Sequence, residues 1–174
     1  MKKLLYSALA IIVLLALTIV TLEFFSSYNV SETINRNAPV QTVQKIIINA
    51  PPEKVYKIMS NINKWDTWHS DVQRPVLLGS FQKGTSFNWK GSGLTIHSTI
   101  HTAVPNSKIG WSGTALGAFA IHNWTFTPSQ DHTIVTVEES MEGWLVSLLH
   151  KKFQAGLERS LQVWLKNLKI EAEK

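Results

Sequence analysis

The 174-residue sequence contains no cysteine. This absence excludes disulfide bonds, thiolate metal sites, cysteine nucleophiles and the lipid attachment of a bacterial lipoprotein. Charged residues are also scarce, and lysine and arginine exceed the acidic residues by only five charges, spread along the chain. A surplus this small and scattered argues against a nucleic-acid partner. The hydrophobic content of 44% is sufficient for a buried core, so the chain as a whole is not disordered.

Several catalytic signatures are missing as well. The sequence has no Gly-x-Ser-x-Gly, no phosphate-binding P-loop, no Gly-x-Gly-x-x-Gly after a strand and no His-Glu-x-x-His. No spacing of residues indicates a metal site, and no cofactor is implied. These absences weigh against an enzyme but do not exclude one, because an enzyme with an internal cavity needs only one or two positioned groups.

A long uncharged run lies near the N-terminus. Residues Leu4–Leu22 are 19 consecutive residues without a charge, enough for a helix of roughly 28 Å, close to the thickness of a bilayer core. Lys2 and Lys3 precede the run, which by the positive-inside rule places the N-terminus in the cytoplasm and the rest of the chain outside. We expect a single-pass anchor of the kind found in a bacterial inner membrane, with the domain facing the periplasm. A cleaved signal peptide and a buried core helix are the alternatives.

The remainder divides into a polar segment and a globular part. We expect residues 1–25 to form the anchor, residues 26–40 a polar tether, and residues 41–174 one domain. In that domain a strand is predicted over 41–49, followed by a short helix that begins at the prolines 51–52 and by a second short helix or turn over 62–68. Six more strands follow, at 74–78, 86–90, 94–104, 108–112, 118–127 and 133–142, with short connections typical of an antiparallel meander.

The pattern becomes helical at the C-terminus. From Gly143 to about Ala172, apolar residues recur every three or four positions, which predicts one helix of about 30 residues. Its apolar stripe must pack on the sheet. The sequence therefore predicts an α+β helix-grip fold, in which a bent antiparallel sheet of about seven strands wraps around a long C-terminal helix. Volume that the helix does not fill would form a cavity.

Several segments, taken in order, resemble a known family. They are Ile48-Asn-Ala-Pro-Pro-Glu-Lys-Val-Tyr56, Trp65-Asp-Thr-Trp68, Gly84-Thr-Ser-Phe87 and His122-Asn-Trp-Thr-Phe-Thr-Pro128. The chain resembles the START-related SRPBCC superfamily, in the branch of polyketide cyclases/dehydrases and lipid-transport proteins. The resemblance implies a helix-grip fold with a deep hydrophobic cavity for a lipid, sterol, polyketide or similar ligand. It carries over no catalytic residue, because the superfamily has no universal catalytic motif.

Strand alternation predicts which side chains line this cavity. In strand 94–104 the even positions are expected to face inward, and His97 and His101 to face outward into solvent. The lining set combines the inner sheet face, Trp68 and two residues of the last helix: Trp68, Phe87, Trp89, Ile96, Ile100, Trp111, His122, Trp124, Val135, Val137, Glu139, Met141, Phe153 and Leu157.

The last two strands supply the one polar pair expected inside. With Phe126 opposite Thr133, His122 lies opposite Val137, and Glu139 becomes its diagonal neighbour at roughly 5–8 Å. The pair is a candidate to orient the polar end of a ligand or to act as acid and base. The simpler interpretation is that the two residues satisfy each other or lie in water at the rim.

Three functions are compatible with these features. The first is a membrane-anchored domain that holds a hydrophobic small molecule or lipid. The second is a cyclase, dehydratase or hydrolase that uses His122 and Glu139. The third is an interaction module whose cavity is filled by its own tryptophans, of which the chain has seven. An internal cavity large enough for a ligand separates the first two from the third.

Overall fold

The computed structural model describes residues 2–28, 30–91 and 93–174. One seven-stranded antiparallel sheet, in the order β1-β7-β6-β5-β4-β3-β2, forms the domain. The strands are β1 (Val40–Ile48), β2 (Val72–Leu77), β3 (Ser86–Gly91), β4 (Leu94–Val104), β5 (Lys108–Ala115), β6 (Ala118–Ser129) and β7 (His132–Glu142). The predicted α+β helix-grip architecture is confirmed, with consecutive strands β2 to β7 paired as a meander.

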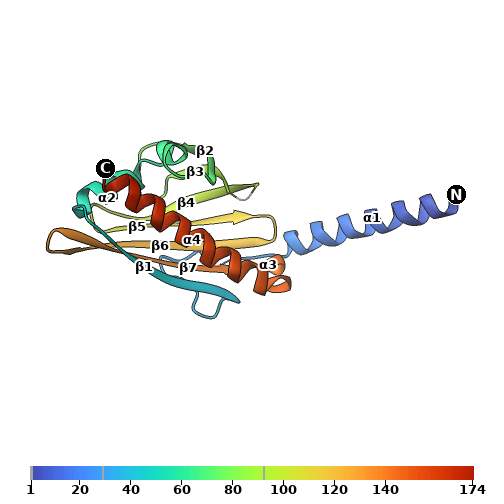
Figure 1. Ribbon diagram of the computed structural model, residues 1–174. Helices are drawn as coiled ribbons and strands as arrows, with labels where there is room; N and C mark the ends of the chain where they lie inside the picture. Colours follow the sequence, from blue (N-terminus) through green and yellow to red (C-terminus); the bar gives the residue numbers. More distant parts are fainter. Residues whose placement is uncertain (1, 29, 92) are drawn as a thin grey trace.

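The described residues also form five helices: α1 (Lys2–Phe24), α2 (Pro52–Ser60), the 3-10 helix η1 (Ile62–Thr67), α3 (Trp144–Leu148) and α4 (His150–Ala172). Figure 1 shows α4 crossing one face of the sheet, with α2 at one end of the domain and α3 at the other, where α1 leaves. The expected single C-terminal helix is wrong, because Leu149 leaves helical geometry (φ −116°, ψ 31°) and separates α3 from α4.

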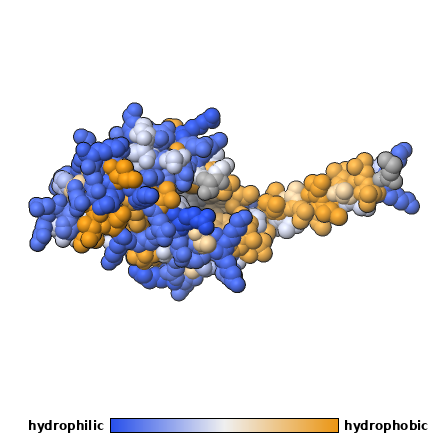
Figure 2. Space-filling model, viewed as in Figure 1, coloured by the Kyte–Doolittle hydropathy of each residue, from blue (hydrophilic) through white to orange (hydrophobic). Residues whose placement is uncertain are grey.

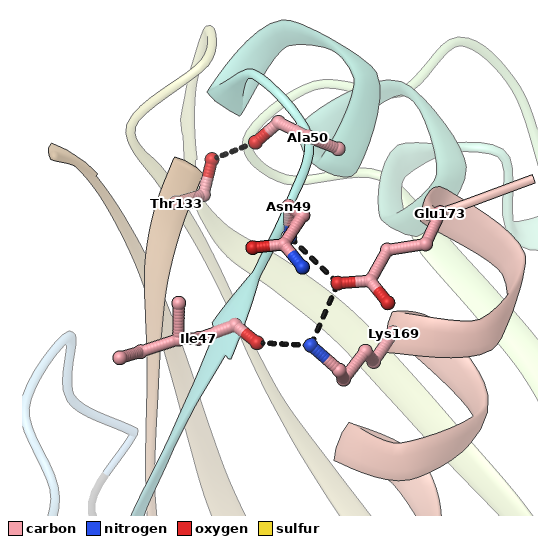
Figure 3. Close-up of polar contacts among 6 residues, drawn as sticks. All are labelled: Ile47, Asn49, Ala50, Thr133, Lys169 and Glu173. Carbon is pink, nitrogen blue, oxygen red and sulfur yellow. Dashed lines mark hydrogen bonds and ion pairs between the residues drawn. The ribbon is translucent and has the colours of Figure 1, made fainter. Parts of the chain in front are cut away.

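The C-terminal end of α4 is fixed to the end of β1 by polar contacts (Figure 3). The Lys169 ammonium donates to the carbonyl of Ile47 at 2.7 Å and to Glu173 at 2.6 Å, and Glu173 also accepts the backbone N–H of Asn49 at 2.7 Å. On the neighbouring strand, the Thr133 hydroxyl donates to the carbonyl of Ala50 at 2.6 Å. These contacts hold the junction between β1 and α2 against the last turn of α4.

The register of β6 and β7 differs from the expected one by two residues. His122 lies opposite Glu139, Trp124 opposite Val137 and Phe126 opposite Val135. The strands turn through two residues between Ser129 and His132, and Gln130 there adopts a positive φ of 50°. A shift of two residues leaves the same side chains on the same face, so the predicted inner face is retained although the pairing was wrong.

Two strands contain irregularities that alter which residues face the core. In β4 the register shifts between Ile100 and Thr102, so Val104 is exposed and Ala103 packs against the core, contrary to the even-position rule. In β2, an edge strand, the register shifts between Gln73 and Val76. Arg74 there has a φ of 49°, and the next residue is Pro75.

The polar segment before β1 lies along the outer face of the sheet. The ring of Tyr28 stacks on Phe119 at 5.1 Å, and Ile34 packs with Phe119 and Ile121 in a small separate cluster. Asn35 donates its backbone N–H to Ser140 and its side-chain amide to Glu142. The segment is therefore attached to β6 and β7 at several points.

Candidate functional site

The space between the sheet and α4 contains a cluster of five tryptophans. Trp65 comes from η1, Trp89 from β3, Trp111 from β5, Trp124 from β6 and Trp164 from α4. Trp65 contacts the rings of Trp89, Trp111 and Trp164, mostly edge to face, with centroids 5.1–6.2 Å apart. Such geometry adds to the free energy gained by burying the rings themselves.

These rings fill the interior closely. Trp65 is fully buried and Trp89, the most accessible of the five, is 7% exposed. Two surface hollows lie outside this interior. One, of about 600 Å³, lies between residues 31–36 and the outer face of β6 and β7, and the other, of about 520 Å³, lies beside α2, η1 and the end of α4. The aromatic interior is thus closed in this conformation.

Two of the interior indoles have no hydrogen-bond partner among the described residues. The N–H of Trp65 donates to the carbonyl of Met59 at 2.9 Å, and that of Trp89 donates to the hydroxyl of Ser98 at 3.2 Å. The N–H groups of Trp111 and Trp124 lie on the same inner face without an acceptor. A buried unsatisfied donor costs about 1–3 kcal/mol, so these two groups are expected to find an acceptor.

The predicted polar pair is present, and closer than expected. Nδ1 of His122 and Oε2 of Glu139 are 2.8 Å apart, with only 13% and 4% of the two side chains exposed. The diagonal arrangement is corrected to a direct one, because the register places the residues opposite each other. The His122 ring also stacks on Trp111 with centroids 4.9 Å apart. The pair therefore adjoins one of the unpartnered indoles.

The predicted lining residues fall into two groups. Nine are buried: Phe87, Trp89, Ile100, Trp111, Trp124, Val135, Val137, Glu139 and Leu157. Five are partly exposed: Trp68, Ile96, His122, Met141 and Phe153. Trp68 packs on Trp164 beside η1. The other four lie toward the end of the sheet where α3 is found, because Met141 precedes α3 and Phe153 is in the first turn of α4. Four partly exposed residues of the predicted lining thus lie at this end, and one, Trp68, lies at the other.

Sequence reasoning missed three interior residues. Trp65 and Trp164 were not among the predicted lining residues, although Trp164 belongs to the apolar stripe of α4 that was expected to pack on the sheet. His69 follows η1 in an irregular segment, where no strand or helix periodicity predicts which way a side chain faces. Its ring is 1% exposed and lies 4.1 Å from that of Trp164, and its Nε2 has no partner among the described residues.

The surroundings of two histidines shift their pKa values. Burial lowers the pKa of His69, although Asp71 opposes the shift. His101, expected on a solvated face, is instead buried against Gly110 and Asn123 beneath the segment that contains Glu32. Burial lowers the pKa of His101 as well, opposed by Glu32, which forms an ion pair with Lys83. His97 stays exposed, as expected, with its Nδ1 2.7 Å from Asn88 Oδ1.

Comparisons with known proteins agree with this architecture. A similar fold is found in hypothetical protein jhp0584 from Helicobacter pylori (TM-score 0.71, 14% identity, covering 84% of this chain and 99% of that one). It is also found in a START superfamily protein from Mycobacterium smegmatis (TM-score 0.68, 12% identity, 76% and 97%). The di-domain ARO/CYC StfQ of the steffimycin biosynthetic pathway has it too (TM-score 0.67, 18% identity, 77% and 50%).

A search of curated proteins found no match. The sequence model of the family described as polyketide cyclase / dehydrase and lipid transport matches residues 30–173. The helix-grip α+β fold thus defines a START-like SRPBCC domain. The chain belongs to the polyketide cyclase/dehydrase and lipid transport family, and this membership, with the fold, suggests a ligand-binding cavity.

Proposed function

We propose that the domain binds a non-polar small molecule or lipid that carries a hydrogen-bond acceptor, held between the inner sheet face and α4. The observation that carries the proposal is the pair of buried, unpartnered N–H groups of Trp111 and Trp124. A carbonyl or hydroxyl oxygen of a ligand would accept from them, while its apolar part would be buried at about 25 cal/mol per Å².

Entry of a ligand requires the aromatic cluster to open. The partly exposed residues Ile96, His122, Met141 and Phe153 indicate that access is easiest beside α3. The break at Leu149 separates α3 from α4 there, so α3 can move without unwinding α4. The pair of His122 and Glu139, near this end, is positioned to meet the polar end of a ligand.

The same proposal includes the membrane. Within the described residues, α1 meets the length and composition requirements of a membrane span, as a signal sequence near an N-terminus also does, and none of its residues is buried. We propose that α1 is retained as an anchor, with the N-terminus in the cytoplasm. Its uncharged run exceeds the 7–15 residues usual for a signal peptide, and Phe24 and Phe25 stand where a cleavage site after the run would need small residues.

Identification of co-purified compounds tests the binding function. The full chain is purified in nanodiscs, extracted with solvent, and compared with variants in which phenylalanine replaces one tryptophan. Trp111→Phe and Trp124→Phe remove the unpartnered N–H groups, whereas Trp65→Phe removes one that donates to Met59. Binding predicts one compound in near-stoichiometric amount that is lost with the first two variants and kept with the third. No enriched compound, or equal loss from all three, would contradict the proposal.

A second candidate function is an interaction module without a ligand. The close packing of the five tryptophans favours it, because a domain whose interior is permanently filled presents only its surface to partners. Xenon or a short alkane at millimolar concentration, observed by chemical-shift changes of the indole N–H signals, separates the two. Saturable shifts at Trp111 and Trp124 support a cavity that opens, and unchanged signals support the filled module.

A further inference from the structure

The end of α1 is connected to the domain by one carboxylate. Oε2 of Glu23 accepts the backbone N–H of Gly117, in the turn between β5 and β6, and the indole N–H of Trp144, the first residue of α3, both at 3.0 Å. Glu23 directly follows the uncharged run that ends at Leu22. The candidate span therefore continues into a fixed contact with the domain.

The packing around this contact leaves no room for a side chain at two positions, Gly117 and Gly143. Gly117 has a φ of +65°, and a Cβ there would lie 2.7 Å from side-chain atoms of both Trp144 and Leu145. Gly143 has a φ of +128°, and a Cβ there would overlap the carbonyl of Gly117. The backbone N–H of Leu145 donates to the same carbonyl at 3.1 Å. The turn and α3 thus form one unit around Glu23.

Exposed apolar side chains gather on this unit. Leu116 is 52% exposed, Leu148 71% and Leu149 40%. Phe25, two residues after Glu23 in the sequence, is 77% exposed. We call Phe25, Leu116, Leu148 and Leu149 the junction surface. Figure 2 shows apolar atoms continuing from α1 onto the end of the domain from which it projects. Nothing among the described residues covers these four side chains.

Positively charged residues lie next to the junction surface and would suit a layer of anionic lipid headgroups. Exposed Lys151 and Lys152 occupy the first turn of α4, which contains no acidic residue. Cations at a helix N-terminus oppose the helix dipole, so the fold gains nothing from them there. Close to a membrane surface, lysines are attracted to anionic lipid headgroups.

We infer that the junction surface lies in the headgroup layer of the bilayer that α1 spans, so that the α3 end of the domain rests on lipid. The inference relies on the proposed anchor. If residues 4–22 fill the hydrocarbon core, Glu23 lies at its boundary, and its two hydrogen bonds hold Gly117 and Trp144 at the same depth. Trp144 then sits where indoles are enriched, at the membrane–water interface. The easiest access to the interior faces the lipid.

Single-site fluorescence quenching tests this arrangement, and the cysteine-free chain makes the labelling specific. The full chain is reconstituted in vesicles of phosphatidylethanolamine and phosphatidylglycerol. An environment-sensitive NBD label is attached to L14C, L116C, L148C or V104C, and lipids with spin labels near the headgroup or deep in the chains serve as quenchers. Val104 is a matched control, because it is an exposed apolar residue at the opposite end of β5 from Leu116.

The expected result is deep quenching at position 14, headgroup-depth quenching with a blue shift at 116 and 148, and neither at 104. Adding Glu23→Ala should reduce the quenching at 148, whereas Glu23→Gln, which keeps an acceptor oxygen, should retain most of it. A label at 14 that stays deep while 116 and 148 behave like 104 overturns the docking but leaves the anchor intact. A blue shift at 148 without lipid quenching means that a protein, including a second copy, covers the surface, and also overturns it. No quenching at 14 removes the anchor itself.

Discussion

Glu139 and His122 face each other across β7 and β6, with Oε2 and Nδ1 2.8 Å apart, both on the inner face of the sheet. A contact between two polar groups this well buried has two consequences. It fixes the orientation of the imidazole, and it makes each residue dependent on the other, because either one alone would be a buried polar group without a partner.

The first prediction concerns this dependence. His122→Leu should lower the free energy of unfolding by about 1–3 kcal/mol, because it leaves the Glu139 carboxyl group buried without its partner. The double variant His122→Leu/Glu139→Leu should lose much less than the sum of the two single changes. Urea unfolding of the full chain in detergent, followed by tryptophan fluorescence, measures all four corners of the cycle. Additive single changes would show that the pair is not coupled.

The second prediction concerns Gly156, in the middle of α4. It is exposed, and a Cβ there would meet no atom within 4 Å. Gly156→Ala should therefore stabilise the domain by about 1 kcal/mol, the difference in helix propensity. Gly113→Ala is the contrasting control, because its Cβ would lie 2.6 Å from the hydroxyl oxygen of Ser98. Thermal unfolding should move in opposite directions for the two variants, and a loss of stability in Gly156→Ala would contradict the open environment.

The third prediction is acid sensitivity from His69 and His101. Burial lowers the pKa of both in the folded protein, so the unfolded chain binds more protons below about pH 6.5, the usual pKa of histidine. Stability should therefore be full above that pH and fall as the pH drops below it. A His69→Gln variant should show a shallower fall of the melting temperature between neutral and mildly acid pH. A His69→Gln variant whose melting temperature falls as steeply as that of the unmodified chain would contradict the prediction.

The fourth prediction concerns the contacts in Figure 3. The N–H of Asn49, together with Lys169, holds the pKa of Glu173 below its usual value. A lowered carboxyl pKa stabilises the fold above the unfolded pKa of about 4 and loses this effect as the pH falls through the folded value. Glu173→Gln should be less stable than the unmodified chain at pH 7, with the difference shrinking on acidification. A difference that stays constant with pH would contradict an ionic origin.

Sequence patterns predicted the architecture well, because the spacing of apolar residues and the turn residues between segments largely determine it. Alternation in β4 to β7 and the three- and four-residue spacing in α4 identify the elements and the inner face. The residue-by-residue pairing of β6 with β7 was harder to predict. The β6–β7 turn uses Gln130 and Asp131, which lack the glycine that marks a two-residue turn, and a slip of two residues changes no side chain's face.

The sequence predicted which residues of the site face the interior, but not whether they leave an empty cavity there. Trp111, Trp124, His122 and Glu139 were identified from alternation alone. Whether their side chains leave space depends on tilted ring contacts with Trp65 and Trp164, which come from distant segments. The burial of His101 was equally inaccessible, because it depends on the bulge in β4 and on the segment from Glu32 that covers it. Neither has a periodic signature.

The irregular backbone of β2 affects how copies of the protein behave when they are close together. It is an edge strand of the sheet, where an unpaired row of N–H and C=O groups can template the addition of a strand from another molecule. Pro75 removes one donor from this row, and the positive φ of Arg74 bends it. At the other edge, α4 places Gln154 against the backbone of Gln41. Copies gathered at high density on one surface are thereby kept from aggregating edge to edge.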